Sequence, residues 1–577
     1  MKKIIILILS LLLFIKDIRF LLLFIVPGII FNKKKRLPIY LIQVVGISLS
    51  FWIVSFWFLK YIPIQLTTFF YVILFLSFVV LNFKPFLFSK KLKFEDVFVI
   101  TLILLVIIIR LVPFLLNYFP AGADMSFHTL TTRIITLNNS VPVNYEPVLP
   151  INFGNYPVGF HAISAYINLI SGLIEYKATL LLANFTYAFL TLASFIFLRK
   201  YFKPIIAFLS ALFISFLANN PQFFISWGGN PFVLSICFLI LAISSIEKLP
   251  KNKLLSALYL ASSFLIHPMP VYGFFYIYLP VFIYRFMKNK NLIKAGLSMA
   301  LIFILFITPF MLNFNYIVSD TEFQWTKQRQ ETKYLSWKGE FIPKFLITLF
   351  GEKIVFLVLI STILLFNKKE LFIKIILMYV STVVLIINSK YWILPFSQLL
   401  WSERVGMLLI IPMSVAFGYL IKIIFDIKFY EKHVTQNKVF IRSIQGFFII
   451  SLLILSFNNY QHYIRVSNIF SMVTQEDLDA FDWILNNTEE DALFLNNYGD
   501  AGLWISPITL RKTRIIQMVP IYMDETEKYL SSLQPEYVYI GNKQVYSINL
   551  DVNSFISDPS NYEQVYKKND VMIFKIK

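Results

Sequence analysis

Long apolar segments constrain this chain more than any other feature of its sequence. Runs of about 20 mostly apolar residues recur from the N-terminus to about residue 457, and a helix of that length crosses the roughly 30 Å hydrocarbon core of a bilayer. Charged residues make up only 15% of the chain, whereas soluble domains have about 25%. The sequence therefore predicts a polytopic α-helical membrane protein with about 13–14 transmembrane helices.

The hydrophilic breaks between the apolar runs place the transmembrane segments. We expect them at 39–59, 66–83, 96–117, 177–197, 204–220, 230–246, 253–266, 270–286, 295–313, 344–366, 371–389, 404–425 and 440–457. The first 31 residues contain two shorter apolar stretches separated by "KDIR", which predict either one broken crossing or a tight hairpin. A cleaved signal peptide is the weaker interpretation, because no small-residue cleavage pattern follows the first stretch.

The net charge of +20 is concentrated in alternate breaks. Lys and Arg cluster at 33–36, 84–93, 199–203, 247–253, 285–294, 367–370 and 427–442, whereas the intervening breaks contain few. This alternation is typical of the positive-inside rule and predicts that all of these clusters face the cytoplasm. The charge therefore indicates the topology of a multi-pass protein of the cell (plasma) membrane, and we expect no nucleic-acid partner. The single cysteine, Cys237, lies in an apolar run, so the sequence predicts neither disulfides nor a cysteine metal site.

The same alternation assigns the remaining breaks to the outer face. They are 118–176, 219–231, 267–270, 314–341, 390–404 and the tail from about 458. In the tail, "TQEDLDAFDWILNNTEEDALFLNN" predicts an amphipathic helix followed by a strand, and "EYVYIG" and "YEQVYKKNDVMIFKIK" predict further strands. We therefore expect a transmembrane domain at 1–457, with 118–176 as its first large extracytoplasmic loop, and a small extracytoplasmic α/β domain at 458–577.

The first outer loop opens with a polar stretch, "PAGADMSFHTLTTRI", directly after an apolar run. Asp124 and His128 are spaced i, i+4, so a helix that begins after Gly122 presents both side chains on one face. A carboxylate at the membrane boundary can deprotonate an acceptor or bind a divalent cation. We therefore select Asp124 and His128 as candidate catalytic residues. The structural alternative is that Asp124 only caps the helix that carries His128.

Other basic side chains at or near the outer face are candidates for holding a phosphate or pyrophosphate at headgroup depth. They are Arg110, Arg133, His161, His267 and Arg404. An isolated His161 can equally be structural, and His267 needs a polar partner because it lies between apolar runs. Arg110 and Arg404 can instead extend toward the membrane surface, and Arg404 can pair with Glu403. The loop 314–341 mixes Trp, Lys and Arg residues, which suits a glycan, a phosphate or an interfacial anchor.

Four stretches together resemble a known superfamily. A membrane helix leads into an outer loop with an acid, "GADMSFH"; "NYPVGFHAISAYINLISG" is similar to a "YP.g.H" stretch of prokaryotic members; "WSERVGMLL" and the C-terminal "AFDWILNNTEEDALFLNNYGDAGLWI" complete the pattern. In these features the chain resembles the GT-C superfamily of integral-membrane glycosyltransferases, which use lipid-phosphate-linked sugars. The resemblance covers most of the chain and implies a GT-C-like transmembrane fold.

The resemblance also implies roles for particular residues. It places Asp124 at the catalytic centre, where the acid activates the acceptor or helps to bind a divalent cation such as Mg²⁺ or Mn²⁺. It places the polyprenyl-phosphate part of the donor in an outer cavity. Two branches of the superfamily are disfavoured by departures from their motifs. The "WWDYG" motif of oligosaccharyltransferase catalytic subunits is absent from the sequence, and Ala123 and Met125 flank Asp124 where protein O-mannosyltransferases have paired acids.

The leading functional hypothesis is a glycosyltransferase that moves a sugar from a polyprenyl-phosphate-linked donor to an extracytoplasmic glycan, lipid or protein. One alternative is a glycan ligase or polymerase that acts on lipid-linked glycans. The other is a flippase or transporter of lipid-linked sugars, although transporters favour internal repeats and polar groups near the bilayer midplane. The enzymatic hypotheses require Asp124, His267 and Arg404 to converge on one cavity at the outer membrane boundary.

Overall fold

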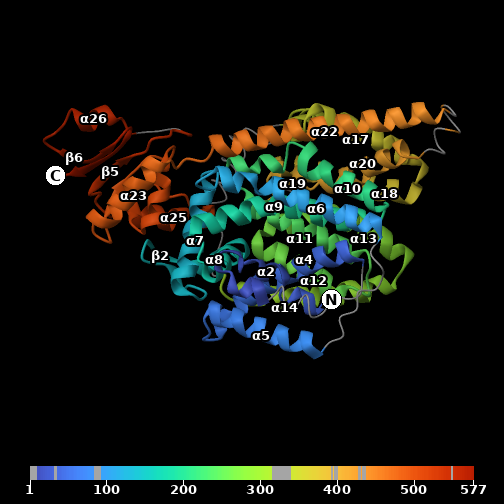
Figure 1. The fold of residues 1–577 in the computed structure, drawn as a ribbon, viewed down its shortest axis with the longest axis horizontal. Helices are drawn as coiled ribbons and strands as arrows, with labels where there is room; N and C mark the ends of the chain where they lie inside the picture. Colours follow the sequence, from blue (N-terminus) through green and yellow to red (C-terminus); the bar gives the residue numbers. More distant parts are fainter. Residues whose placement is uncertain are drawn as a thin grey trace.

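A helical body and a smaller C-terminal lobe make up the molecule (Figure 1). The structure, a computed structural model, describes residues 10–31, 36–83, 93–314, 339–391, 394, 400–426, 431, 434, 437–546 and 550–577. The C-terminal lobe, which we define as residues 471–577, projects from one end of the body. Most of the outer loop 314–341 and part of the segment 390–404 lie outside the described residues.

The body contains a helix in every segment that the sequence assigns to the membrane. These helices are α4 (Leu37–Phe58), α5 (Leu66–Phe83), α6 (Phe94–Leu116), α9 (Glu175–Leu198), α10 (Pro204–Leu212), α11 (Asn230–Ile246), α12 (Lys253–Ile266), α13 (Pro268–Lys288), α14 (Asn291–Met311), α16 (Ile342–Phe350), α17 (Glu352–Leu364), α18 (Lys369–Tyr391), α19 (Ser402–Met407), α20 (Ile410–Ile424) and α22 (Lys438–Ile469). The predicted multi-pass helical membrane fold is confirmed.

Among the described residues, nine helices are long and apolar enough to cross a membrane, or ten if α16 and α17 form one span. This count is below the predicted 13–14, partly because α11 and α12 are shorter apolar helices. The predicted segment 344–366 is not straight: α16 and α17 meet at 114°. Gly351, between them, has a φ of +91°, a left-handed conformation that glycine adopts without steric cost.

Short helices replace a complete crossing in the described part of the first 31 residues. These are α2 (Leu21–Ile25) and α3 (Gly28–Phe31), both packed against α4. Leu22 and Leu23 are fully buried, and the Trp52 indole on α4 donates to the carbonyls of Leu23 and Val26 at 3.1 and 2.9 Å. The segment therefore completes the core of the body.

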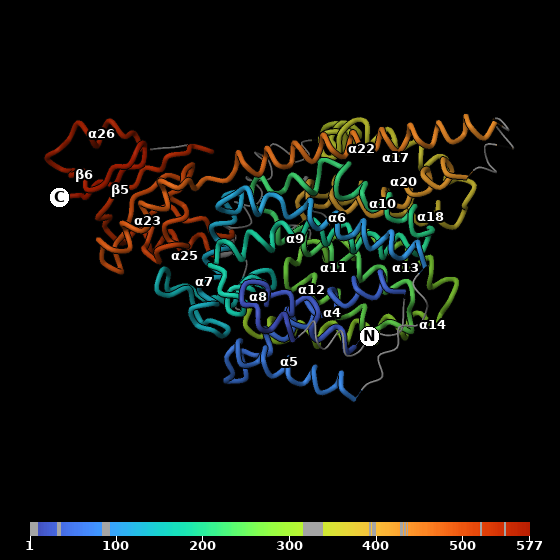
Figure 2. Tube along the Cα trace, viewed as in Figure 1, coloured from blue at the N-terminus to red at the C-terminus, as the bar shows by residue number. Residues whose placement is uncertain are grey.

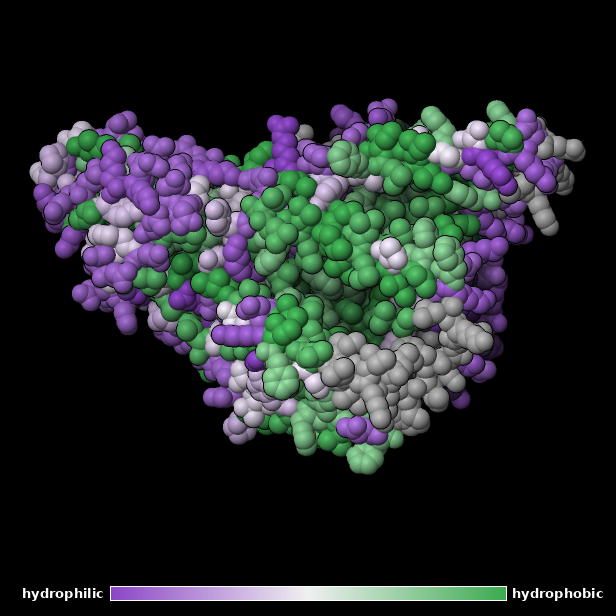
Figure 3. Space-filling model, in the orientation of Figure 1, coloured by the Kyte–Doolittle hydropathy of each residue, from purple (hydrophilic) through white to green (hydrophobic). Residues whose placement is uncertain are grey.

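Burial separates the central helix of the body from those at its periphery. The apolar stretch of α9 is 94% buried, whereas those of α6 and α22 are only 22% and 11% buried. Apolar side chains cover much of the visible face of the body, and hydrophilic side chains cover the lobe (Figure 3). An apolar face on this scale requires a hydrocarbon solvent, so the body lies in the bilayer and the lobe lies in water.

Residues 118–176, which the sequence predicts to be the first outer loop, fold into their own small unit at the end of the body next to the lobe (Figures 1 and 2). It contains α7 (Asp124–Asn138), the strands β1 (Asn144–Tyr145) and β2 (Leu149–Asn152), and α8 (Gly159–Ser171). The two strands pair in antiparallel fashion, and α7 packs on α8. The predicted helix start after Gly122 is thus found at Asp124.

The C-terminal lobe contains a five-stranded sheet in the order β4-β3-β5-β7-β6. Its strands are β3 (Leu493–Leu495), β4 (Lys512–Thr513), β5 (Tyr537–Ile540), β6 (Tyr562–Lys568) and β7 (Val571–Ile576), and its helices include α23 (Gln475–Asn487), α24 (Ile505–Thr509), α25 (Pro520–Ser531) and α26 (Val552–Ile556). β3 is parallel to β4 and β5, whereas β7 is antiparallel to its neighbours. The predicted order of helix then strand is confirmed. Helix α22 continues beyond residue 457 to Ile469, so the division proposed at 457 falls inside a helix.

Candidate active site

Asp124 lies where the first outer loop, the body and the C-terminal lobe meet. It is the first residue of α7; the capping position is Ala123, which makes no side-chain cap. The Asp124 backbone N–H donates to the Trp227 carbonyl at 3.1 Å. Its carboxylate accepts a 2.6 Å hydrogen bond from the Gln517 side chain of the lobe. The lobe therefore binds and orients the carboxylate. Asp124 does not occupy the capping position that the structural alternative assigned to it.

Two glycines in left-handed conformations bring the Trp227 turn against the start of α7. Gly122 and Gly228 have φ values of +95° and +96°. A Cβ on Gly122 would lie 2.2 Å from the Gly228 nitrogen, and a Cβ on Gly228 would lie 3.0 Å from the Asp124 Cβ. Only residues without side chains permit this approach. The "WGGNP" turn is thus part of the support beneath Asp124.

His128 and His161 form a buried imidazole pair one turn beyond Asp124. His128 Nδ1 and His161 Nε2 are 2.9 Å apart, and the two side chains are 4% and 0% exposed. Burial lowers the pKa of His128 to about 3. Burial is the main cause that holds the pKa of His161 well below its ordinary value. Repulsion from a protonated His128 is the second cause. Both rings are therefore neutral near pH 7, with one nitrogen donating and the other accepting.

His267 and Arg404 form a second pair. His267 precedes α13, and its Nδ1 accepts a hydrogen bond from the Met269 N–H at 3.3 Å. Its Nε2 lies 3.4 Å from Arg404 Nη1. Burial is the main cause that holds the pKa of His267 well below its ordinary value, and the positive charge of Arg404 is the second. The ring is therefore neutral, with a proton on one of its two nitrogens. The neutral ring accepts from the Met269 N–H at Nδ1 when its proton is on Nε2, and it accepts from Arg404 Nη1 at Nε2 when its proton is on Nδ1.

Aromatic rings hold the Arg404 guanidinium in place. Its central carbon is 4.3 Å from the centre of the Trp401 ring and 5.1 Å from that of Trp227. The Phe232 ring stands edge-on to His267, with ring centres 5.4 Å apart. Cation–π contacts of this kind fix an arginine without neutralising its charge. The Trp227 turn therefore contacts both the start of α7 and Arg404.

Tyr156 lies near both the acid and the arginine. Burial raises the pKa of its phenol, Arg404 lowers that pKa and Asp124 raises it further, which means that the phenol lies within electrostatic range of both charges. The ring of Tyr156 is also 6.0 Å from that of His161. His128 in turn contributes to the lowered pKa of His267. The structure thus brings five of the predicted residues into one neighbourhood: Asp124, His128, His161, His267 and Arg404.

Arg110 lies elsewhere, inside the helical body. It is fully buried, and its Nη2 donates to the Gln222 side chain at 3.1 Å. Its guanidinium faces the rings of Phe216 at 4.0 Å and Tyr463 at 4.7 Å. These contacts join α6 to η4 (Phe213–Leu217), η5 (Gln222–Ser226) and α22. The role of Arg110 in phosphate binding stays a prediction. The contacts that the structure shows for Arg110 hold neighbouring helices together.

Arg133 lies at the junction with the lobe. Its Nη1 donates to the carbonyls of Pro507 and Ile508, which belong to α24. Burial lowers its pKa, and Glu175 opposes that shift. The guanidinium therefore joins α7 to the lobe. Its predicted role in phosphate binding is likewise untested by these contacts.

Asp124 is a candidate ligand for a divalent cation in the sequence. In the described part of the chain, no three His, Cys, Asp or Glu side chains lie close enough together to hold a metal ion. The acid at the site accepts from an amide, and its neighbouring imidazoles hydrogen-bond to each other. These described residues do not fit a dedicated cation site.

Three residues of the site were not selected from the sequence. Tyr156 lies in the stretch "NYPVGFHAISAYINLISG" and Trp227 in the predicted outer break 219–231. In both places an aromatic residue near predicted site residues was an available signal. Gln517 had no such signal. It lies 393 residues from Asp124 in sequence, and only the packing of the lobe brings its amide to the carboxylate.

Comparison with solved structures defines the class of fold. The apo oligosaccharyltransferase of Archaeoglobus fulgidus superposes with a TM-score of 0.52 at 12% identity, covering 78% of this chain and 70% of that chain. ArnT from Cupriavidus metallidurans, bound to undecaprenyl phosphate, superposes with a TM-score of 0.53 at 11% identity, covering 83% of this chain and 97% of that chain. Both are GT-C membrane glycosyltransferases. The fold predicted from the sequence, a GT-C transmembrane body with a small sheet-containing region at its C-terminus, is confirmed.

By sequence, the chain belongs to DUF6541, a family of unknown function whose profile matches residues 90–532. A search of curated proteins finds no match. The matched range includes α7, α8, Arg404 and Gln517, so the family covers the whole neighbourhood of Asp124.

Proposed function

We propose that this protein is a membrane glycosyltransferase that moves a sugar from a polyprenyl-phosphate-linked donor to an acceptor outside the cytoplasm. The GT-C fold supports the class of reaction. The observation that carries the proposal is the contact of Arg404 Nη1 with His267 Nε2 at 3.4 Å, in the same neighbourhood as the Asp124 carboxylate. In the tautomer with its proton on Nε2, His267 presents a second N–H donor beside Arg404. An anionic leaving group needs such donors, and an acceptor needs such a base.

In the proposed reaction, a phosphate oxygen of the donor accepts hydrogen bonds from Arg404 Nη1 and His267 Nε2. The acceptor attacks the anomeric carbon, and the bond between that carbon and the phosphate oxygen breaks. Its electron pair leaves with the polyprenyl phosphate, whose negative charge Arg404 stabilises. The proton of the attacking acceptor passes to Asp124, and Gln517 holds the carboxylate in a fixed orientation. No other co-reactant is needed for this displacement.

The imidazole pair has a positioning role in this scheme. With a pKa near 3, His128 does not supply a proton from an imidazolium near pH 7. Its hydrogen bond to His161 joins α7 to α8, which fixes the helix on which Asp124 lies. His128 therefore acts on the reaction through the placement of Asp124.

The lipid part of the donor is inferred from chemistry and from fold. The site lies at one end of an apolar body, where a phosphate on a lipid chain meets water. The fold of ArnT, whose structure contains undecaprenyl phosphate, superposes on most of this chain. We infer that a polyprenyl chain of the same chemical class occupies the apolar region beside the phosphate.

Substitution of Asp124 tests the proposal. Asp124→Asn keeps the shape of the side chain and its contact distance to Gln517, but it removes the base. We expect transfer from polyprenyl-phosphate sugars to fall by at least about a hundredfold, the usual contribution of a general base, while the variant remains folded. The assay uses the purified full chain in lipid nanodiscs, with mass spectrometry to detect the glycosylated product.

A matched control and the alternatives fit the same assay. Asp524→Asn makes the same chemical change at an exposed position on α25 and should leave transfer unchanged. Undiminished transfer by Asp124→Asn would remove Asp124 from the mechanism. Products that grow by whole lipid-linked glycans would identify a ligase or polymerase, and movement of the lipid-linked sugar across vesicles without a new glycosidic bond would identify a flippase.

A further inference from the structure

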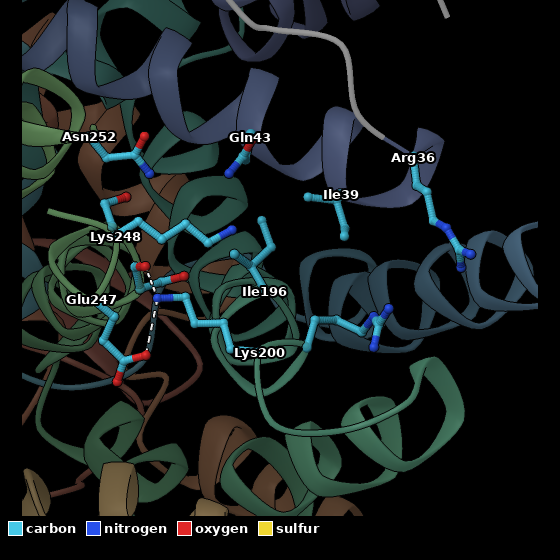
Figure 4. A pocket seen from close by; sticks show the side chains of 11 residues that line it. Arg36, Ile39, Gln43, Ile196, Lys200, Glu247, Lys248 and Asn252 are labelled. Carbon is cyan, nitrogen blue, oxygen red and sulfur yellow. Dashed lines mark hydrogen bonds and ion pairs between the residues drawn. The ribbon is translucent and has the colours of Figure 1, made fainter. Parts of the chain in front are cut away.

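Three basic clusters of the sequence meet in one cavity on the body, at residues that the positive-inside pattern assigns to the cytoplasmic side. The cavity has a volume of about 520 Å³, within the range of small-molecule sites. It is lined by Arg36, Ile39, Gln43, Ile196, Arg199, Lys200, Ser244, Ser245, Glu247, Lys248 and Asn252 (Figure 4). These residues come from the start of α4, the end of α9, the last turn of α11 and the break between α11 and α12.

Positive charge dominates the lining. Four of the residues are basic and one, Glu247, is acidic. Glu247 is already engaged: it lies 3.4 Å from Lys200 Nζ and accepts from the Tyr201 hydroxyl. Arg36 lies 3.8 Å from Glu95 on α6. In the part of the chain that the structure describes, Arg199 and Lys248 make no salt bridge.

Basic groups outnumber acidic groups around the cavity. Arg199 lies within electrostatic range of Arg36, Glu95 and Asp96. Burial lowers the pKa of Lys200 to about 8; Glu247 opposes this shift, whereas Lys248 and Arg285 add to it. Ammonium and guanidinium groups gathered in this way repel one another, and a bound anion would relieve that repulsion.

Polar side chains complete the lining between the basic groups. Gln43 is 9% exposed, and Ser244 and Ser245 are 6% and 5% exposed. The Lys248 side chain extends across the cavity between Lys200 and Gln43 (Figure 4). Amide and hydroxyl donors beside lysine and arginine are the groups that bind the several oxygens of a phosphate. A lining of this kind does not suit an apolar ligand.

Helix ends explain part of this arrangement without a ligand. Basic residues at helix C-termini are stabilised by the helix dipole, and α9 and α11 end at the cavity. The positive-inside rule also places basic residues on this side. Neither effect requires a cavity of this size or buried Gln and Ser side chains in its wall.

We propose that this cavity binds the phosphate group of an anionic ligand on the cytoplasmic side of the membrane, apart from the site at Asp124. Two sources share that chemistry: the headgroup of an anionic phospholipid of the inner leaflet, and a soluble phosphate compound. Basic pockets between transmembrane helices on the cytoplasmic side are known to take anionic headgroups. The site does not depend on the proposed glycosyl transfer.

Thermal unfolding of the purified full chain in neutral detergent tests this proposal. One arm adds phosphatidylglycerol, a second adds inorganic pyrophosphate, and a third adds zwitterionic phosphatidylcholine. Because a ligand that binds only the folded state raises its stability, we expect a higher unfolding temperature in the first or second arm and none in the third. The arm that responds identifies the source of the phosphate.

Variants connect the response to the cavity. Arg199→Gln and Lys248→Gln should each weaken the response about tenfold in ligand concentration, as the loss of a charge-assisted hydrogen bond predicts, and Lys248→Arg should retain it. Lys251→Gln is the matched control, because Lys251 is exposed in the same break and does not line the cavity. The proposal is overturned if neither anion stabilises the protein more than phosphatidylcholine, or if the Arg199 and Lys248 variants respond like Lys251→Gln.

Discussion

Asp124 and His128 lie one turn apart on α7, and each is held by a different part of the chain. The carboxylate accepts from Gln517 of the lobe at 2.6 Å, whereas the imidazole contacts His161 of α8 at 2.9 Å. The i, i+4 spacing was sufficient to predict that both side chains share a helix face. The partners were not predictable from spacing, because each contact depends on how a distant segment packs.

The lowered pKa of His128 predicts a specific dependence of stability on pH. In the unfolded chain the imidazole takes up a proton below its ordinary pKa of 6.5, but in the folded protein it does so only near pH 3. The unfolded state therefore binds more protons between these values, and the stability from the buried neutral ring is complete above pH 6.5 and is lost as the pH falls toward 3.

The measurement is the unfolding temperature in detergent as a function of pH. His128→Gln removes the titrating group and should flatten the decline between pH 6.5 and 3 relative to the parent protein. His462→Gln, at an exposed position on α22, should leave that slope intact. Equal slopes for the parent and His128→Gln would show that the buried imidazole is not the group that titrates.

At the scale of elements, tight turns decide where the site residues lie. The sequence predicted helices in all of the membrane segments from apolar length alone, because that signal is local. It did not predict the 114° bend between α16 and α17, or the contact of the "WGGNP" turn with α7. Both features depend on glycines in left-handed conformations, at Gly351 and Gly228, and a single glycine does not reveal its φ from sequence.

Gly228→Ala tests the support beneath Asp124. The φ of +96° and the 2.9 Å approach of the added Cβ to the Met125 nitrogen leave no unstrained place for a methyl group. We expect a loss of about 1–3 kcal/mol in stability, the usual cost of such backbone strain, and a larger loss of transfer activity than of stability. Gly446→Ala has open space around its Cβ and should be neutral or slightly stabilising in both measurements. Normal activity in Gly228→Ala would mean that the turn does not position Asp124.

At the scale of the whole molecule, the structure is an apolar body with a hydrophilic lobe at one end (Figures 1 and 3). Composition and charge pattern were sufficient to predict this division, because both report which solvent each segment meets. The convergence of Asp124, His267 and Arg404 was an expectation of the enzymatic hypotheses. The Gln517 contact and the basic cavity arise from three-dimensional packing, which no linear pattern encodes.

The chain offers a direct test of which side of the membrane the lobe occupies. Cys237 is fully buried, so a new exposed cysteine should be the main target of a membrane-impermeant maleimide. We propose that the lobe is extracytoplasmic, and we expect labelling of Glu563→Cys in intact cells. Lys251→Cys, in a predicted cytoplasmic break, should be labelled only after the cells are opened. The reverse pattern would invert the topology and place the Asp124 site in the cytoplasm.

The most direct test of the central claim is an experimental structure of the full chain in lipid nanodiscs with added undecaprenyl phosphate. The account predicts that the phosphate lies within hydrogen-bond distance of Arg404 Nη1 and His267 Nε2, on the side of the pair that faces Asp124. A phosphate bound elsewhere on the protein, with Arg404 and His267 contacting only each other and the surrounding rings, would contradict it.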